Sequence, residues 1–363
     1  MGKPLGVGIV GVGNISGQYL SNLPKLSNLK LVGVSDLNQD RSESVAAEHG
    51  VIAFHDEEIY NSPEIDVILN LTLPQSHAEV NLKALAAGKH VYLEKPFALS
   101  VAEALPVLEL AEKNNLRIGC APDTFLGTGI QTSKHLLESG AIGTPFAASA
   151  FWSAPGHELW HPNPQFYYLA GAGPLFDMGP YYLTALVFLL GSVTSVIGNA
   201  THTNRQRMVH TGDLAGTQIE VEVETHISAI LTHANGAQST IMVSFEAWGS
   251  RLPTIEVYGT EGTITAPDPN RFSDETFIYH KDTREWKAVE PLAGYIDAGR
   301  GYGLAEMAAA IEANRPHRAS GELGFHILEV MESIIKSSQS ESRIKITSTV
   351  AKIELVPLSQ QPQ

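Results

Sequence analysis

The sequence has little cysteine, little positive charge and no long apolar segment. Its 363 residues include one cysteine, Cys120, which excludes an internal disulfide. The 24 Lys and Arg residues against 39 Asp and Glu residues give a net charge of −15, which disfavours binding to a phosphate backbone. No run of about 18 apolar residues is present to span a bilayer. We therefore expect neither nucleic acid nor a membrane as a partner.

What is present is the composition of a globular enzyme, with 43% hydrophobic and 17% charged residues. The length predicts two domains, which we place at residues 1–122 and 123–363. The opening segment MGKPLGVGIVGVGN has one lysine and several glycines rather than the apolar core and cleavage site of a signal peptide. Together with the single cysteine, this predicts a cytoplasmic protein.

Short apolar runs alternate with helical patterns in the first third of the chain. We predict strands at residues 5–10, 29–35, 67–71, 90–93 and 117–119, and helices at 14–26, 39–49, 76–87 and 100–114. The last two helices begin at serines suited to N-caps and stop near Gly88 and Asn115. Such βαβ units predict an α/β fold whose N-terminal domain contains a twisted parallel sheet.

After Cys120 the pattern changes and strands dominate. We expect helices at 129–139, 179–190, 302–313 and 321–337, and strands at 145–152, 193–202, 218–233, 237–246, 253–258, 262–265, 276–280 and 343–355. The turn Ala234-Asn235-Gly236 predicts a hairpin. The second domain is therefore expected to be α+β, with its strands in a sheet of meander type. An unclaimed face of that sheet favours a homodimer or homotetramer.

The segment GVGNIS at residues 11–16 is close to the dinucleotide fingerprint GxGxxG, and it follows an apolar strand and opens a helix. Gly11 permits the tight turn, and Gly13 lets the backbone approach a pyrophosphate. The alternative is a glycine-rich turn without a ligand. We expect cofactor contacts from Gly11, Gly13, Asn14 and Ile15.

An acidic residue, Asp36, stands at the end of the second predicted strand. A carboxylate there can accept a hydrogen bond from the adenosine ribose 2′-hydroxyl, and it repels a 2′-phosphate. NAD is therefore favoured over NADP, with Arg41 partly offsetting that preference. Leu37, the next residue, is expected to belong to the same site.

The segment LTLPQSH at residues 71–77 ends another strand and opens a helix. It is expected to line the cofactor crevice near the nicotinamide ribose through Thr72, Leu73, Pro74 and His77. The segment also reads as a helix start capped by Ser76, and both interpretations can hold.

The segment KHVYLEKP at residues 89–96 brings a charged pair, Glu94 and Lys95, to the end of an apolar strand. Open α/β sheets bind ligands at the carboxyl ends of their strands, and Pro96 favours an extended backbone at Lys95. We expect both charged residues to contact the cofactor and Lys95 also to contact the substrate. The alternative is a solvated lysine at a strand end.

The segment GAGPLFDMGPYYL at residues 171–183 combines an acid with a phenol. Pro180 fits a first helical turn, which places Asp177 near the cap and Tyr181 about one turn later on the same face. A tyrosine can take the proton of an alcohol if a cation such as Lys95 lowers its pKa from about 10. Lys95, Asp177 and Tyr181 are the expected catalytic residues. Taken alone, the segment is better explained as a capped helix with buried aromatic residues.

The loop GHELWHP at residues 156–162 precedes this helix and mixes polar groups with an aromatic face suited to a sugar ring. The prolines at 162 and 164 oppose a helix that would hold its two histidines on one face, so no metal is expected. Arg300, between two glycines, is expected to be a solvated loop residue, with contact to an anionic substrate as the alternative. Besides the catalytic residues, we expect substrate contacts from Asp123, Trp152, His157, Trp160 and His161.

The order of these motifs resembles a known family. GVGNIS, the EKP at 94–96, GIQTSKHLLESGAIGTP at 129–145 and the DxGxY pattern at 177–181 together resemble the glucose–fructose oxidoreductase, inositol dehydrogenase and MocA-like family over nearly the whole chain. The resemblance implies an N-terminal Rossmann domain with a doubly wound parallel sheet and a C-terminal α+β domain with an open, mostly antiparallel sheet. It also implies a nicotinamide cofactor and oxidation or reduction of a sugar or polyol hydroxyl. It also implies that Lys95 is the family's EKP lysine, Asp177 its motif aspartate and Tyr181 its proton-transfer residue.

Two positions depart from the family pattern. Many members have histidine in place of Tyr181 and an acid in place of Thr184, so this chain resembles the branch with tyrosine, and its substrate stays open. Many members also have a basic residue in the loop at 121–125. Here Asp123 is expected instead to accept from a substrate hydroxyl or from the nicotinamide amide.

The sequence therefore predicts an oxidoreductase that uses NAD, with NADP less favoured, to act on a small carbohydrate or glycoside. One alternative is a redox glycosidase, which oxidises a ring carbon, eliminates the aglycone and reduces the sugar again. Another is a non-catalytic sensor of NAD or a sugar. The presence of Lys95, Asp177 and Tyr181 counts against the sensor.

Overall fold

A computed structural model describes residues 3–55 and 57–362 and divides the chain into two compact units. Two segments from late in the sequence belong with the N-terminal residues, so the chain does not divide at a single point near residue 122. The substrate-binding role expected for the second domain stays a prediction. Unit 1 comprises Met1–Thr128, Gly294–Phe325 and Val356–Gln363, and unit 2 comprises Gly129–Ala293 and His326–Leu355.

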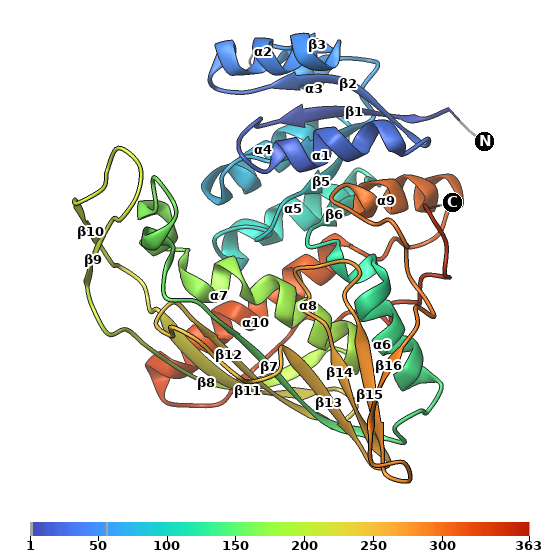
Figure 1. Cartoon of the computed structure of the whole chain (residues 1–363). Helices are drawn as coiled ribbons and strands as arrows, with labels where there is room; N and C mark the ends of the chain where they lie inside the picture. The colour runs from blue at the N-terminus through green and yellow to red at the C-terminus, as the bar shows by residue number, and fades with distance from the viewer. Residues whose placement is uncertain (1–2, 56, 363) are drawn as a thin grey trace. The chain divides into compact units, whose positions relative to one another are not determined.

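Within the described residues, unit 1 contains a six-stranded sheet in the order β3-β2-β1-β4-β5-β6 (Figure 1). The pairings are parallel, and the order runs outward from β1 in two directions, which confirms the doubly wound fold. The short β3 was not predicted. The strands are β1 Leu5–Val10, β2 Leu29–Ser35, β3 Ile52–Ala53, β4 Val67–Asn70, β5 His90–Leu93 and β6 Ile118–Cys120.

The helices between these strands follow the sequence signals at most of their ends. Ser100 caps α5 by accepting from the Glu103 N–H at 3.3 Å. Gly88 and Asn115 follow α4 and α5 with φ angles of 75° and 52°, as expected of helix stops. Ser76 precedes α4, but the expected side-chain cap is absent there. The helices of unit 1 are α1 Ser16–Asn22, α2 Gln39–His49, α3 Glu58–Asn61, α4 His77–Ala86, α5 Val101–Lys113 and α9 Tyr302–Glu312.

Unit 2 is built on a mixed sheet whose described strands run in the order β16-β15-β14-β13-β7-β12-β11-β8-β17. Only the β7–β12 pair among these is parallel, so the sheet is mostly antiparallel, as predicted. Helices α7 and α8 pack against its central strands, and α10 lies on the same face (Figure 1). The strands are β7 Pro145–Ser153, β8 Val193–Thr201, β11 His226–His233, β12 Gln238–Ser244, β13 Ile255–Gly259, β14 Gly262–Ala266, β15 Thr276–His280, β16 Trp286–Val289 and β17 Ile344–Lys345. The helices are α6 Thr128–Glu138, α7 Gly173–Asp177, α8 Gly179–Leu190 and α10 Gly321–Ser340, of which α6 belongs to unit 2 from Gly129 and α10 from His326.

The hairpin predicted at 234–236 joins β11 to β12, but the strand predicted at 218–233 is two strands. Its first part, β10 Gln218–Glu220, pairs with β9 Gln206–Met208 in a separate ribbon (Figure 1). The residues between β10 and β11 leave the ladder because Glu222 donates its N–H to the Tyr168 carbonyl at 2.9 Å.

The last predicted strand, 343–355, is reduced to β17. The backbone N–H groups of Thr347 and Ser348 donate instead to the Glu329 carboxylate on α10, each at 2.8 Å. These bonds replace strand pairing, because a carboxylate competes well for backbone donors.

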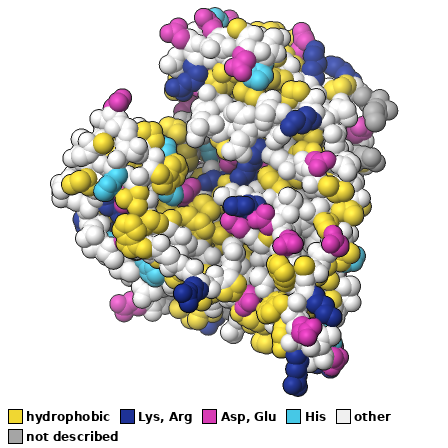
Figure 2. Space-filling view, in the orientation of Figure 1, with side chains coloured by type: hydrophobic (Ala, Val, Ile, Leu, Met, Phe, Trp, Pro, Cys, Tyr) yellow, Lys and Arg dark blue, Asp and Glu magenta, His cyan; other side chains and the backbone are white. Residues whose placement is uncertain are grey.

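The surface carries acidic and basic side chains interspersed among hydrophobic and uncharged ones (Figure 2). In the described part of the chain, no helix is both long enough and apolar enough to traverse a bilayer.

Candidate active site

The phosphate loop, residues 11–16, has the geometry that its glycines predict. Gly11 adopts φ +89°, and a Cβ there would lie 2.9 Å from the backbone of Leu71 and Thr72. A Cβ on Gly13 would meet nothing within 4 Å, and Gly13 and Asn14 are exposed. The loop is therefore closely packed on one side and open on the other, as a backbone that receives a pyrophosphate requires.

Asp36 is fixed beside this loop. Its Oδ2 accepts from the Val12 N–H at 2.8 Å, and its Oδ1 accepts from the Asn38 N–H at 2.9 Å. The Arg41 guanidinium is 3.9 Å away and half exposed, so it weakens the local negative charge only slightly. Leu37 is fully exposed. The carboxylate thus lies at the end of β2, where the sequence predicted it.

Asn70, at the end of β4, shapes the segment at 71–77. Its side-chain oxygen accepts from the Thr72 N–H at 3.1 Å and from the Thr72 hydroxyl at 2.7 Å, and its amide donates to Asn81 at 2.9 Å. Asn70 is fully buried, whereas Leu73 is 62% exposed. Sequence reasoning missed Asn70, although a lone polar residue ending the apolar run VILN was the available signal.

His77 lies in the interior rather than at the cofactor face. Its Nδ1 is 2.7 Å from the Pro96 carbonyl and its Nε2 is 3.1 Å from the Thr72 carbonyl. Burial lowers its pKa, although both carbonyls favour the protonated ring. Because both ring nitrogens are engaged, His77 connects the Thr72 segment to the EKP segment. The cofactor contact expected of His77 stays a prediction.

Glu94 is likewise an internal connection. Its Oε1 accepts from the Tyr19 hydroxyl on α1 at 2.7 Å, and its Oε2 accepts from the Lys95 N–H at 3.0 Å. Glu94 is 6% exposed, whereas Lys95 is partly exposed. Glu94 therefore holds the backbone that carries Lys95 and connects it to the helix after the phosphate loop. The cofactor contact expected of Glu94 stays a prediction.

Asp123 is fully buried, which opposes the substrate or nicotinamide contact expected for it. It pairs with Arg300 at 3.3 Å and accepts from the N–H groups of Gly301 and Gly303 at 3.0 and 3.1 Å. Burial raises the pKa of the Asp123 carboxyl, an effect that Arg300 and the N–H donors oppose. Asp123 therefore anchors the start of α9, and Arg300 is buried rather than solvated.

In unit 2, Asp177 and His157 form a pair with 2.9 Å between Asp177 Oδ2 and His157 Nε2. Asp177 is the last residue of α7 and immediately precedes Met178, the N-cap of α8. Tyr181 lies in the first turn of α8, and its side chain is buried. The chain thus brings together one expected catalytic residue and one expected substrate-binding residue.

Aromatic rings surround His157. Phe245 and Tyr167 lie 4.5 and 4.2 Å from it between ring centroids, and Trp160 lies at 5.2 Å. Trp160 is 59% exposed, so the cluster reaches the surface. We call this the aromatic cluster: Trp152, His157, Trp160, His161, Phe166, Tyr167 and Phe245. It contains all of the residues expected from the 156–162 loop.

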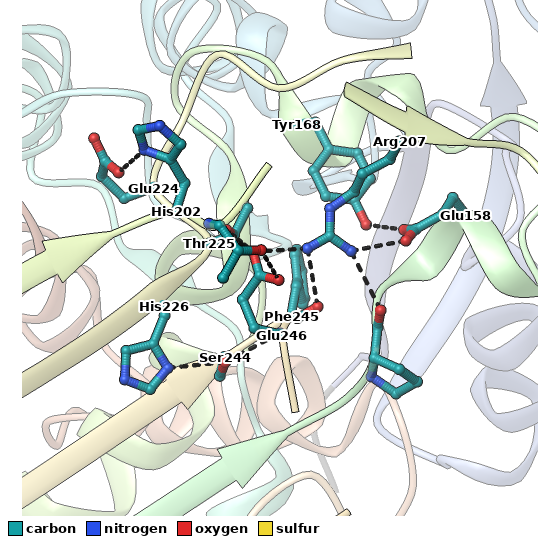
Figure 3. A network of polar contacts seen from close by, with 12 residues as sticks. Glu158, Tyr168, His202, Arg207, Glu224, Thr225, His226, Ser244, Phe245 and Glu246 are labelled. Atoms are coloured by element: carbon teal, nitrogen blue, oxygen red, sulfur yellow. Dashed lines mark hydrogen bonds and ion pairs between the residues drawn. The ribbon is translucent and has the colours of Figure 1, made fainter. Parts of the chain in front are cut away.

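A buried charge network centred on Arg207 of β9 supports this loop (Figure 3). Arg207 donates to Glu158 at 2.7 Å and pairs with Glu246 at 2.8 Å, and the Tyr168 hydroxyl donates to Glu158. Burial opposes charge on Arg207, but these neighbours raise its pKa overall. Sequence reasoning missed this network, because its members lie far apart in the chain.

The parallel sheet, the glycine loop and the acid at the end of β2 define unit 1 as a dinucleotide-binding Rossmann domain. Residues 5–121 match the oxidoreductase family with an NAD-binding Rossmann fold, and residues 130–265 match the GFO/IDH/MocA C-terminal domain. The chain belongs to the Gfo/Idh/MocA oxidoreductase family, and this confirms the predicted NAD-binding domain. Its place in the tyrosine-containing branch stays a prediction.

Relatives match along nearly the whole chain. The myo-inositol 2-dehydrogenase of Thermotoga maritima is 23% identical over 350 residues, 95% of this chain and 99% of the relative. The NAD-binding oxidoreductase of Klebsiella pneumoniae has the same fold, with a TM-score of 0.82, 24% identity and coverage of 95% and 99% of the two chains. A levoglucosan dehydrogenase solved with NADH and L-sorbose gives a TM-score of 0.81, 22% identity and the same coverage.

Across residues 3–55 and 57–362, no group of three or more His, Cys, Asp or Glu side chains is arranged to hold a metal ion.

Proposed function

We propose that the protein is an NAD-dependent oxidoreductase that transfers hydride between the nicotinamide and a sugar or polyol. The observation that carries this proposal is the fixed Asp36 carboxylate beside the open phosphate loop, in a chain of this family. The carboxylate is held by backbone donors, so it is oriented before a ribose arrives. It therefore supports NAD over NADP, because a 2′-phosphate would meet an anchored negative charge.

The substrate class is supported by the aromatic cluster and by the relatives. Aromatic faces beside polar groups suit a sugar ring, and Trp160 offers an exposed face. The relatives named above include an inositol dehydrogenase and a protein solved with L-sorbose. A small carbohydrate or polyol with several hydroxyl groups is therefore the proposed substrate.

We assign the proton transfer to Tyr181, as the sequence predicted. NAD, when bound, supplies the hydride acceptor. Tyr181 takes the hydroxyl proton of the alcohol, the Lys95 ammonium favours the phenolate, and Asp177 accepts from a substrate hydroxyl. Reduction of a ketone reverses these proton movements. A homodimer or homotetramer formed through the sheet of unit 2 is part of the same proposal.

Removal of the phenol and of the ammonium tests this assignment. Tyr181→Phe and Lys95→Ala are expected to lower kcat by about 10²- to 10⁴-fold, as is usual for a lost acid–base group. The assay is a panel of inositols, sugars and glycosides with NAD or NADP, followed at 340 nm and by product analysis. Tyr279→Phe, on β15, is the control and should retain activity. Unchanged turnover in both variants would contradict the assignment.

A further inference from the structure

His157 has one ring nitrogen engaged and one that lacks a partner. Its Nε2 lies 2.9 Å from Asp177 Oδ2. Its Nδ1 is buried, and within the described part of the chain it makes no hydrogen bond. The side chain is 8% exposed, so water does not reach it easily.

This arrangement fixes the tautomer of the ring. A hydrogen on Nδ1 would be a buried donor without an acceptor, which is costly. A lone pair on Nε2 would face the carboxylate oxygen of Asp177, which is repulsive. The geometry therefore favours the tautomer that carries its hydrogen on Nε2, donated to Asp177, with a lone pair on Nδ1.

The backbone of His157 is held as firmly as its ring. Its N–H donates to the Tyr168 hydroxyl at 3.0 Å, and that hydroxyl donates to Glu158. Arg207 donates to Glu158 at 2.7 Å and to the Pro155 carbonyl at 3.2 Å (Figure 3). The aromatic cluster packs the ring on several sides. His157 therefore presents one N–H in one direction.

We propose that His157 is a positioning residue that orients the Asp177 carboxylate for its substrate, rather than a substrate contact itself. This inference rests on the proposed function, in which Asp177 accepts from a substrate hydroxyl. A carboxylate at the junction of α7 and α8 can rotate about its side-chain bonds. One short hydrogen bond from an immobile donor restricts that rotation, and a restricted acceptor orients a substrate better than a mobile one.

Two substitutions at His157 separate the N–H from the ring. His157→Phe keeps the ring shape without a donor, and His157→Gln keeps an N–H with a similar reach. His157→Phe should lower kcat/KM for the sugar or polyol by about tenfold or more, because it removes a hydrogen bond to a charged group. Its affinity for NADH should be unchanged. His157→Gln should recover part of this loss, which a purely structural role of the ring would not allow.

His202→Phe is the matched control, because His202 also pairs with a carboxylate, Glu224, at 2.7 Å in unit 2. It should leave kcat/KM unchanged. Two results with an active wild-type enzyme would overturn the inference while the proposed function stands. One is a kcat/KM of His157→Phe equal to that of the wild type. The other is a kcat/KM of His157→Gln no higher than that of His157→Phe.

A second readout does not depend on turnover. The ligand-free protein is labelled with nitrogen-15 at histidine, and the ring signals that disappear in His157→Gln are assigned to His157. These signals should show a protonated Nε2 and an unprotonated Nδ1. Asp177→Ala should change the chemical shifts of the same signals. A protonated Nδ1, or no response to Asp177→Ala, would refute the pairing. Absence of turnover with every alcohol tested would instead refute the proposed function, and the spectra would still decide the pairing.

Discussion

The Val12 N–H donates to Asp36 Oδ2 at 2.8 Å, which ties the acid at the end of β2 to the turn of the phosphate loop. The acid and the loop are 24 residues apart in sequence, yet they form one rigid corner of unit 1. A ribose that binds beside the loop meets a carboxylate that is already oriented.

The first prediction concerns this carboxylate. Asp36→Ser removes the charge and the second acceptor oxygen, so it should raise the Kd for NADH by about tenfold or more and reduce the preference for NAD over NADP. Fluorescence titration with NADH and NADPH measures both effects. Asp40→Asn, an exposed position on α2, is the control. If Asp36→Ser binds both coenzymes like the wild type, Asp36 has no role in the ribose site.

The second prediction concerns the bond between Tyr19 and Glu94. Burial and the nearby Glu94 raise the pKa of Tyr19 well above its usual range, so its hydroxyl remains a donor. Tyr19→Phe leaves a buried carboxylate oxygen without that donor and should lower the free energy of unfolding by about 1–3 kcal/mol. Urea unfolding measures this, with Tyr279→Phe as the control. Equal losses in the two variants would argue against the bond.

The third prediction concerns Arg207. Arg207→Met leaves Glu158 and Glu246 without their cation and should lower the free energy of unfolding by about 3–5 kcal/mol. Arg205→Met is the matched control, because Arg205 is half exposed and lies 3.9 Å from Glu224, where an ion pair contributes little. A loss below about 1 kcal/mol for Arg207→Met would show that the network is not needed for stability.

The fourth prediction concerns pH. His326 on α10 accepts from the Val193 N–H at 3.0 Å, and burial lowers its pKa to about 4. The unfolded chain, with a histidine pKa of about 6.5, binds the proton first as pH falls. The stability that His326 provides is therefore complete above about pH 6.5 and declines toward pH 4, by about 3 kcal/mol at most.

His326→Gln tests this linkage, because it removes the titrating group. The free energy of unfolding of the wild type should fall more between pH 7.5 and pH 4.5 than that of His326→Gln. The other buried histidines are present in both proteins, so their effect cancels in the comparison. Parallel curves for the two proteins would contradict the predicted pKa.

Much of unit 1 was predictable, because its signals are local. The five predicted parallel strands are short apolar runs separated by helical patterns, and Gly88 and Asn115 mark helix ends by their own backbone preferences. Asp36 was placed correctly because its position follows directly from the end of β2. The membership of α9 in unit 1 was not predictable, since sequence distance alone does not tell which unit a late helix joins.

The polar contacts that hold the candidate site residues were less predictable than the strands and helices that carry them. Glu94, His77 and Asp123 were recognised, but each is buried and engaged with groups remote in sequence, such as Arg300, which is 177 residues from Asp123. The His157–Asp177 bond joins residues separated by an irregular loop, where no periodicity indicates which side chains meet. Nonlocal polar contacts of this kind leave no regular pattern in the sequence.

The stoichiometry of coenzyme reduction tests the central claim most directly. The wild-type protein is incubated with NAD and each member of a panel of inositols, sugars and glycosides, while NADH and all carbohydrate products are quantified. We predict one NADH for each ketone formed from at least one sugar or polyol. Absence of NADH formation with every substrate, or release of an aglycone without net NADH, would contradict it.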